Sequence, residues 1–215
     1  MDKEQFWNIV NEVHSSTDPR NQKEVLAALR NRLRNLPSEE ILEWKQIFSF
    51  YQDAARRNDL WAASAAMGAH SSDDGFMDFR SWLISQGHDV YMSALEDPES
   101  LVSVDTDGQE LNFEDYAYVP YRAYAERRAY EEMSVGDILA SYIKWAATNE
   151  QQKQNDPAAG EKVMPQKSTD FFVQSAMLGK YDLYDEMERR ELPDDVLRSL
   201  KEDIPQRGDI ADGWQ

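Results

Sequence analysis

The chain has 215 residues, of which 41% are hydrophobic, with six Trp, ten Tyr, eight Phe and no Cys. This apolar content is enough for a sizeable core and argues against an extended disordered chain. The lack of Cys excludes disulfides, thiolate metal sites and a thiol nucleophile.

The formal net charge of −18 lies entirely after residue 58, because residues 1–58 hold nine basic and nine acidic side chains. Such an acidic surface repels nucleic acid and anionic lipid and favours a basic partner. Acidity that serves solubility alone is the alternative. The first ten residues lack the apolar run of a signal peptide, and no apolar stretch is long enough to span a membrane. We therefore expect a cytoplasmic protein without nucleic-acid or membrane partners.

Three helices are predicted in the first quarter of the chain. Apolar residues recur at helical spacing over 2–14. Asp18, followed by Pro, is predicted to cap a second helix that ends before Pro37, and Ser38 is predicted to cap a third. The third helix has a wide apolar face, which predicts burial on more than one side. That face consists of Ile41, Leu42, Trp44, Ile47, Phe48 and Tyr51.

Shorter helices are predicted in the middle of the chain, over 59–70, 76–86 and 89–96, with Gly87 as a C-terminal cap. Residues 99–111 have the only strand-like pattern, which fits a short hairpin or a loop. A Tyr-rich helix is predicted over 113–132, in which Pro120 either causes a kink or marks the true start.

The last third is predicted to hold helices over 135–150, 169–191 and 193–203, with a polar linker or loop over 150–168. Short connections and interrupted apolar patterns favour crossing helices over a bundle of long parallel ones. We therefore predict an all-α fold: a globular, orthogonal multi-helix domain over 1–133 and a smaller helical extension over 134–215.

One long string resembles a known family. Residues 72–87 read SDDGFMDFRSWLISQG, preceded by DKEQFW at 2–7 and DLWAA at 59–63 and followed by the Tyr-rich EDYAYVPYRAYAE at 114–126. These segments resemble a bacterial family defined as a domain of unknown function, over about residues 1–130. The resemblance implies no reaction; it implies a link to regulatory or toxin–immunity systems, which some members resemble.

The same string predicts a polar site. Carboxylates at the start of a helix, an Arg one to two turns later and nearby Trp rings could hold a small polar ligand. The residues of this predicted site are Trp61, Asp73, Asp74, Arg80, Trp82, Ser85 and Gln86. The alternative is a structural role, in which Asp74 and Arg80 form a buried ion pair that fixes two helices and the Trp side chains belong to the core.

The Tyr-rich helix predicts a second kind of site. Tyr rings surrounded by acidic side chains suit a surface that binds a basic protein. Five Tyr side chains cannot share one helical stripe, so some of them are expected to face outward. We predict partner contacts from Tyr116, Tyr121 and Tyr124; the alternative is a core helix with polar tips.

Other motifs argue against catalysis or metal binding. The three His residues lie on separate segments, and Asp105 begins a sequence that fails the calcium-loop spacing and fits a turn. Phosphate-binding glycine loops and hydrolase motifs are absent. The basic cluster at Arg30, Arg32 and Arg34 fits a solvated helix face. We expect no catalytic residue, no metal and no cofactor.

These observations favour a non-catalytic protein-binding module, such as an immunity or antitoxin-like or regulatory protein, that holds a basic partner, for example a toxin. The alternative is a small-ligand binder or enzyme that uses Asp73, Asp74 and Arg80. A structural or oligomerisation module is the third hypothesis.

Overall fold

A computed structural model describes residues 1–132, 187 and 189–205 of the chain, and this part is helical without a strand. Its helices are α1 (Lys3–Ser16), α2 (Gln22–Arg34), α3 (Ser38–Ala54), α4 (Asn58–Ala66), α5 (Asp73–Ser85), α6 (His88–Glu96), the 3-10 helix η1 (Pro98–Ser103), α7 (Glu114–Glu132) and α11 (Asp194–Asp203). The all-α prediction is confirmed. Within the described residues, no helix has the length and apolar character needed to cross a membrane.

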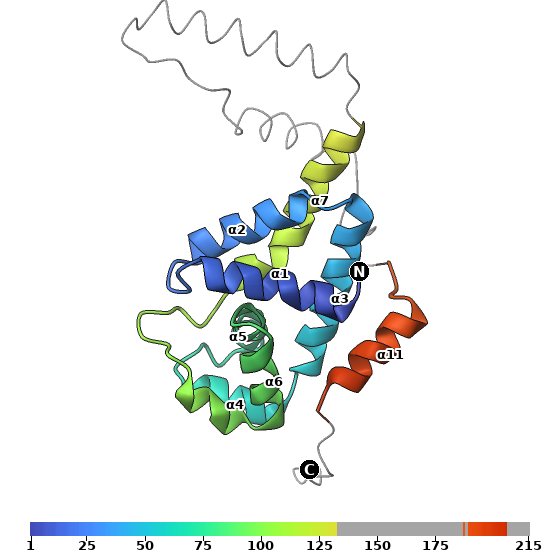
Figure 1. Cartoon of the computed structure of the whole chain (residues 1–215). Coiled ribbons are helices and arrows are strands. Elements are labelled where there is room, and N and C mark those ends of the chain that lie inside the picture. Colours follow the sequence, from blue (N-terminus) through green and yellow to red (C-terminus); the bar gives the residue numbers. More distant parts are fainter. Residues whose placement is uncertain (133–186, 188, 206–215) are drawn as a thin grey trace, which may run out of the picture.

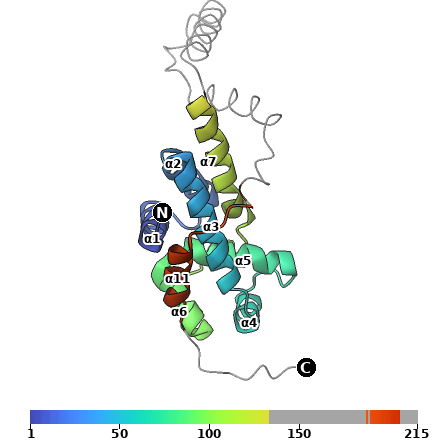
Figure 2. The ribbon, with the colours of Figure 1, turned by 90° about the vertical axis from the view of Figure 1, so that its right-hand side faces the viewer.

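The helices cross one another at steep angles. In Figure 1, α1 and α2 run across the view while α5 is seen end-on beneath them. Helix α7 packs against α2, α3 and α5, and η1 packs against α4 and α6. Figure 2 shows α7 at one end of the described part of the chain and α4 and α6 toward the other. This is the orthogonal multi-helix arrangement that the short connections predicted.

The core is dominated by aromatic rings. Phe6 and Trp7 of α1 lie 5.1 Å from Trp44 and 4.7 Å from Tyr51 of α3, respectively, measured between ring centroids. Tyr91 of α6 contacts Tyr51 at 5.4 Å. All six residues of the predicted apolar face of α3 are buried, which confirms that this helix packs on more than one side.

Two of the predicted helix caps are wrong. The side chain of Asn21 caps α2 by accepting from the backbone N–H of Glu24 at 3.3 Å, whereas Asp18 pairs with Arg20 in the preceding turn. Ser38 is the first residue of α3 and is buried, and its backbone N–H donates to Glu131 of α7. In both places another group satisfies the free N–H at the helix start.

Helix α5 begins three residues before the predicted range of 76–86 and ends one residue before the end of that range. The hydroxyl of Ser72 accepts from the backbone N–H of Gly75 at 3.1 Å and caps the helix. Gly87 follows α5 with φ of +93°, the left-handed conformation typical of a glycine at a helix C-terminus. Gly75 has a different role: a Cβ there would lie 2.5 Å from both the Cβ and the carbonyl oxygen of His70, so the backbone of residue 70 needs a glycine beside it.

The hairpin considered for 99–111 does not form. Pro98–Ser103 is a 3-10 helix capped by Asp97, and a turn follows in which the N–H of Asp107 bonds to Asp105 at 3.1 Å. Of the apolar residues here, Leu101 is buried, but Val102 is 90% exposed. Pro120 lies inside α7, which begins at Glu114, so it does not mark the start of that helix.

The last described helix returns to the N-terminal helices. Leu200 of α11 is buried in the core, and Asp203 binds Lys3 of α1 and Tyr51 of α3. This confirms a helix at 193–203. The helix predicted at 135–150, the linker at 150–168 and nearly all of the helix at 169–191 lie outside the described residues.

Candidate functional site

A cavity of about 560 Å³ opens where the end of α3, the start of α4 and the first two turns of α5 meet. Its size is within the range of small-molecule sites. The cavity is lined by Gln52, Asp53, Arg56, Arg57, Asn58, Trp61, Asp73, Asp74, Phe76, Met77 and Arg80. It therefore brings together four of the residues that the sequence predicted: Trp61, Asp73, Asp74 and Arg80.

Arg80 is the most buried charged residue of this cavity, with 8% of its surface exposed. Its Nη1 donates to the carbonyl oxygen of Gln52 at 2.7 Å, and its Nε donates to that of Phe76 at 3.4 Å. Burial lowers the pKa of Arg80, and the Asp53 carboxylate opposes this through space. No carboxylate of the described residues lies within ion-pair distance of the guanidinium.

The buried ion pair between Asp74 and Arg80, which was the structural alternative for this segment, therefore does not form. Asp73 and Asp74 are exposed in the first turn of α5, where their negative charge also suits the positive end of the helix. The Arg80 side chain folds back along α5, so its guanidinium lies 5.1 Å from the ring centroid of Phe76, four residues earlier. It is held there by backbone carbonyls instead of by a carboxylate.

An aromatic wall completes the cavity. The rings of Trp61 on α4 and Phe76 on α5 are stacked, with centroids 5.2 Å apart and planes 6° from parallel. The indole Nε1 of Trp61 donates to the carbonyl oxygen of Ser71 at 3.3 Å, which fixes the ring. Beside this wall, the side chain of Met77 is 40% exposed.

Of the other charged side chains that line the cavity, Arg57 is paired, whereas Arg56 and Asp53 are not paired within the described residues. Arg57 forms a two-bond ion pair with Asp59 and donates to the carbonyl oxygen of Leu95 at 2.6 Å. Arg56 and Asp53 are exposed, and in the described part of the chain their side chains form no ion pair. The cavity thus offers free charges of both signs.

Asn112 holds the start of α5 in place. Its Nδ2 donates to the carbonyl oxygen of Gly75 at 2.9 Å, and its Oδ1 accepts from the backbone N–H of His70 at 3.2 Å. Nearby, burial raises the pKa of Asp78, and the carboxylates of Glu114 and Asp74 raise it further. Asp78 does not line the cavity, so we assign it no role in binding.

Trp82, Ser85 and Gln86 do not belong to this site. Trp82 is buried and its Nε1 donates to Oε1 of Gln109 at 3.0 Å. The Gln86 amide donates to Ser85 Oγ at 3.2 Å, inside the protein. The prediction that Trp82 and Gln86 contact a ligand with Arg80 is wrong for this fold, because they lie on other faces of α5 and are satisfied there.

The five tyrosines of α7 differ in how much of their side chains is exposed. Tyr116 and Tyr124 are at most 1% exposed and belong to the core, so they cannot form part of an exposed surface. Tyr121 is half-buried with Lys45 5.7 Å from its ring centroid, and Tyr130 is 64% exposed. The acidic, Tyr-rich helix therefore does not present its tyrosines as one surface.

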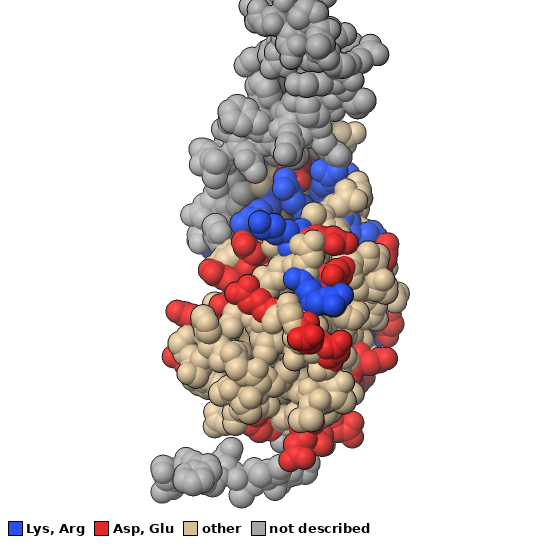
Figure 3. Space-filling model, turned by 90° about the vertical axis from the view of Figure 1, so that its left-hand side faces the viewer, with Lys and Arg blue, Asp and Glu red and all other residues tan. Residues whose placement is uncertain are grey.

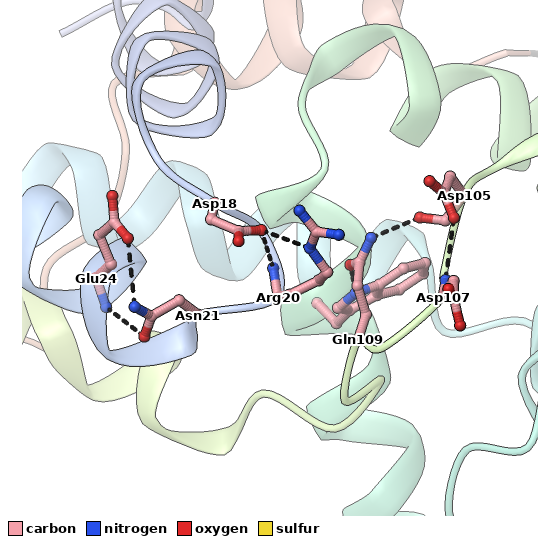
Figure 4. A network of polar contacts seen from close by, with 8 residues as sticks. Asp18, Arg20, Asn21, Glu24, Asp105, Asp107 and Gln109 are labelled. Carbon is pink, nitrogen blue, oxygen red and sulfur yellow. Dashed lines mark hydrogen bonds and ion pairs between the residues drawn. The ribbon is translucent and has the colours of Figure 1, made fainter.

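The other sequence motifs have structural roles. No group of His, Asp and Glu among the described residues is arranged to hold a metal ion. The turn at Asp105 and Asp107 is confirmed, and Figure 4 shows Arg20 between these residues and its partner Asp18. Arg30 pairs with Glu126 of α7, so this arginine joins two helices and is not simply solvated.

Sequence analysis missed the contribution of α3 to the cavity. Gln52 and Asp53 lie in the last turn of α3 and Arg56 follows the helix, about twenty residues before Asp73. The only sequence signal for them is a run of polar and charged residues that ends a strongly apolar helix.

Comparison with known proteins identifies a family whose function is unknown. Residues 1–126 match the family model described as "Protein of unknown function (DUF4240)", which agrees with the resemblance over about 1–130. No curated protein and no solved structure matches the chain. The function must therefore be argued from the residues themselves.

Proposed function

The chain belongs to the family described as Protein of unknown function (DUF4240), and we propose from its own residues that it is a binding protein whose cavity holds a small ligand by an acidic group. In this proposal Arg80 is the main anchor and Arg56 is a second cation near the opening. Trp61 and Phe76 contact the body of the ligand.

The buried, unpaired charge of Arg80 is the observation that carries this proposal. Removing a charged group from water has a high free-energy cost unless an opposite charge and hydrogen bonds replace the water. Two backbone carbonyls bond to Arg80, but no carboxylate pairs with it among the described residues. A guanidinium has five N–H donors in a planar fork that fits carboxylate or phosphate groups. A ligand with such a group would supply the missing charge.

The test is direct binding of 3-phenylpropionate and phenyl phosphate, two probes with one acidic group and one ring. We expect both to shift NMR signals of residues around the cavity. Arg80→Lys should weaken binding more than about tenfold, because a lysine lacks the two-pronged donor geometry. Arg56→Gln, at an exposed position, should weaken binding without disturbing the fold.

Arg122→Gln is the matched control. Arg122 is exposed on α7, pairs with Asp115 at 3.1 Å, and does not line the cavity. The substitution Arg122→Gln changes the net charge of the protein by the same amount as Arg56→Gln. It should leave the binding of both probes unchanged. Binding that is insensitive to both Arg80→Lys and Arg56→Gln, or equally sensitive to Arg122→Gln, would overturn the proposed function.

A second candidate is a cytoplasmic module that binds a basic protein, and the distribution of charge supports it. Residues 59–115 contain thirteen Asp and Glu but one Arg, which is the buried Arg80. The lower part of the face in Figure 3 shows acidic and uncharged residues without Lys or Arg. In the form that the family resemblance implies, the partner is a basic toxin and this chain is its immunity protein.

This second candidate is tested by affinity capture from the native host followed by mass spectrometry. One dominant basic protein should be recovered, and Glu99→Lys with Glu110→Lys should abolish its capture, because both residues are exposed in the acidic segment. Glu4→Lys, exposed on α1, is the control outside that segment. Equal capture by all these variants would contradict an interface on residues 59–115.

A further inference from the structure

The charges around the cavity point to a more specific ligand class. We infer that the ligand is a small zwitterion, such as an α-amino acid with an apolar side chain, whose acidic group binds Arg80 while its ammonium group binds Asp73 and Asp74. This inference rests on the proposed function, since it names the substrate class of the same cavity.

The charges that line the cavity are balanced. The lining residues include three arginines and three aspartates, so their formal charges cancel. A polyanion that reached Arg80 would also meet the carboxylates of Asp53, Asp73 and Asp74, and repulsion would weaken its binding. A simple cation would leave Arg80 buried without a counter-charge. A neutral ligand with separated charges satisfies both sets of residues.

The two sets of charges also lie on neighbouring turns of α5. The Arg80 guanidinium lies over Phe76, because Nε bonds to the Phe76 carbonyl and the ring centroid is 5.1 Å away. Asp73 and Asp74 precede Phe76 by two to three residues, which corresponds to about 3–5 Å along the helix axis. The ammonium and carboxylate groups of an α-amino acid are attached to the same carbon, which suits acidic and basic side chains that line one cavity from neighbouring turns of one helix.

An apolar wall lies next to these charges. Trp61 and Phe76 are stacked, and Met77 has an exposed side chain beside them. A ligand whose charged end lies between Arg80 and Asp74 can place an apolar body against this wall. Small-molecule sites commonly combine such an apolar surface with a few polar groups that fix orientation.

Asp73 and Asp74 also have a purely structural explanation, which the experiment must separate from binding. Carboxylates in the first turn of a helix interact favourably with its positive end. If this were their only role, their neutralisation would change the free energy of unfolding without distinguishing one ligand from another. Selectivity between ligands is therefore the decisive measurement.

The experiment compares three probes with the same phenyl body on the full chain: phenylalanine, 3-phenylpropionate and phenethylamine. Binding is followed by the NMR signal of the Trp61 indole N–H, assigned with Trp61→Phe. We expect phenylalanine to bind about tenfold more tightly than 3-phenylpropionate, since the ammonium group adds charge-assisted hydrogen bonds. Phenethylamine should bind weakest because it leaves Arg80 unpaired.

The double variant Asp73→Asn/Asp74→Asn should remove this preference. We expect the affinity for phenylalanine to fall to that for 3-phenylpropionate, while 3-phenylpropionate binds as well as before or better. The matched control is Glu114→Gln/Asp115→Asn, which neutralises two carboxylates in the first turn of α7, outside the cavity lining. This control should keep the preference for phenylalanine.

The outcomes distinguish the two proposals. If 3-phenylpropionate binds through Arg80 as tightly as phenylalanine, or if Asp73→Asn/Asp74→Asn keeps the preference, the zwitterion inference is wrong and the anion site remains. If none of the three probes shifts the Trp61 signal, the proposed function fails together with the inference.

Discussion

The hydroxyl of Tyr51 donates a hydrogen bond of 2.9 Å to Oδ2 of Asp203, while Oδ1 of the same carboxylate lies 2.9 Å from Nζ of Lys3. One side chain at the end of α11 thereby joins that helix to α3 and α1. Tyr51 is followed by Gln52, whose carbonyl accepts the hydrogen bond from Arg80. The C-terminal helix therefore attaches next to the backbone that positions the cavity arginine.

Asp203→Ala should lower the free energy of unfolding by about 2–3 kcal/mol. The substitution removes two hydrogen bonds, one of them to a charged partner, and each such bond contributes on the order of 1–3 kcal/mol. Both Lys3 and Asp203 are largely covered, so solvent screening reduces their interaction only in part. Urea unfolding monitored by circular dichroism measures the change.

The neighbouring variant Glu202→Gln provides the control for Asp203→Ala. Glu202 is exposed on the same helix, and we expect a change within about 0.5 kcal/mol. An equal effect of both variants would show that α11 is stabilised by general charge and not by the Asp203 contacts.

The protein should become less stable as the pH rises above about 10, the ordinary pKa of tyrosine. Burial raises the pKa of Tyr51, Tyr91 and Tyr116 in the folded state, and the hydrogen bond to Asp203 raises the pKa of Lys3. Between the unfolded and the folded pKa values the folded state binds more protons, so unfolding becomes more favourable with each increase in pH. The stabilisation is fully present below the unfolded pKa values.

This alkaline effect is measured by urea unfolding at several pH values and by tyrosinate absorbance. We expect the unfolding midpoint to fall above pH about 10, and the buried tyrosines to ionise together with the loss of helical signal. Ionisation of all ten tyrosines of the chain before any helix is lost would contradict the burial of Tyr51, Tyr91 and Tyr116.

Tyr116→Ala and Tyr124→Ala should each lower the free energy of unfolding by about 3–5 kcal/mol, the usual cost of removing a large ring from a core. The ring centroid of Tyr116 lies 5.9 Å from that of Phe48 on α3 and 5.2 Å from that of Phe113, the residue before α7. Tyr130→Ala, at an exposed position, should change stability by less than about 1 kcal/mol. Equal stability of all three variants in urea would mean that the α7 tyrosines form a surface after all.

The α7 tyrosines illustrate which part of the fold the sequence could predict. Helical spacing identified the helix itself, since periodicity depends on local geometry. Spacing alone could not say which side of α7 is covered, because α7 packs against three other helices and buries several faces. The predicted cap at Asp18 was wrong because Asn21, three residues later, is also a residue type that caps helices and is the one that accepts the backbone hydrogen bond.

The cavity was predictable where its residues are close in sequence. Asp73, Asp74 and Arg80 lie within two turns of one helix, so the sequence placed them on the same element. Gln52 and Asp53 come from α3, and only the packing of α3 against α5 brings them to the same cavity. The same packing brings the carbonyl oxygen of Gln52 to the Arg80 guanidinium. Arg80 therefore bonds to the backbone of α3, and an ion pair with Asp74 does not form.

Gly75→Ala tests the local structure that positions the cavity residues of α5. In most helix interiors this change stabilises by about 0.5–1 kcal/mol because alanine has the higher helix propensity. Here the added Cβ would lie 2.5 Å from the carbonyl oxygen of His70, whose backbone is held by Asn112. We therefore expect the opposite sign, a loss of about 1–3 kcal/mol in the free energy of unfolding, typical of overpacking.

Ala27→Gly provides the matched comparison for Gly75→Ala, because Ala27 is exposed in α2 and reports propensity alone. We expect that variant to lose about 0.5–1 kcal/mol. If the close approach of His70 is correct, Gly75→Ala and Ala27→Gly both destabilise the protein, although they exchange the same two residues in opposite directions. Stabilisation by Gly75→Ala would mean that residue 70 does not lie against α5, and that the start of α5 is not fixed by Asn112.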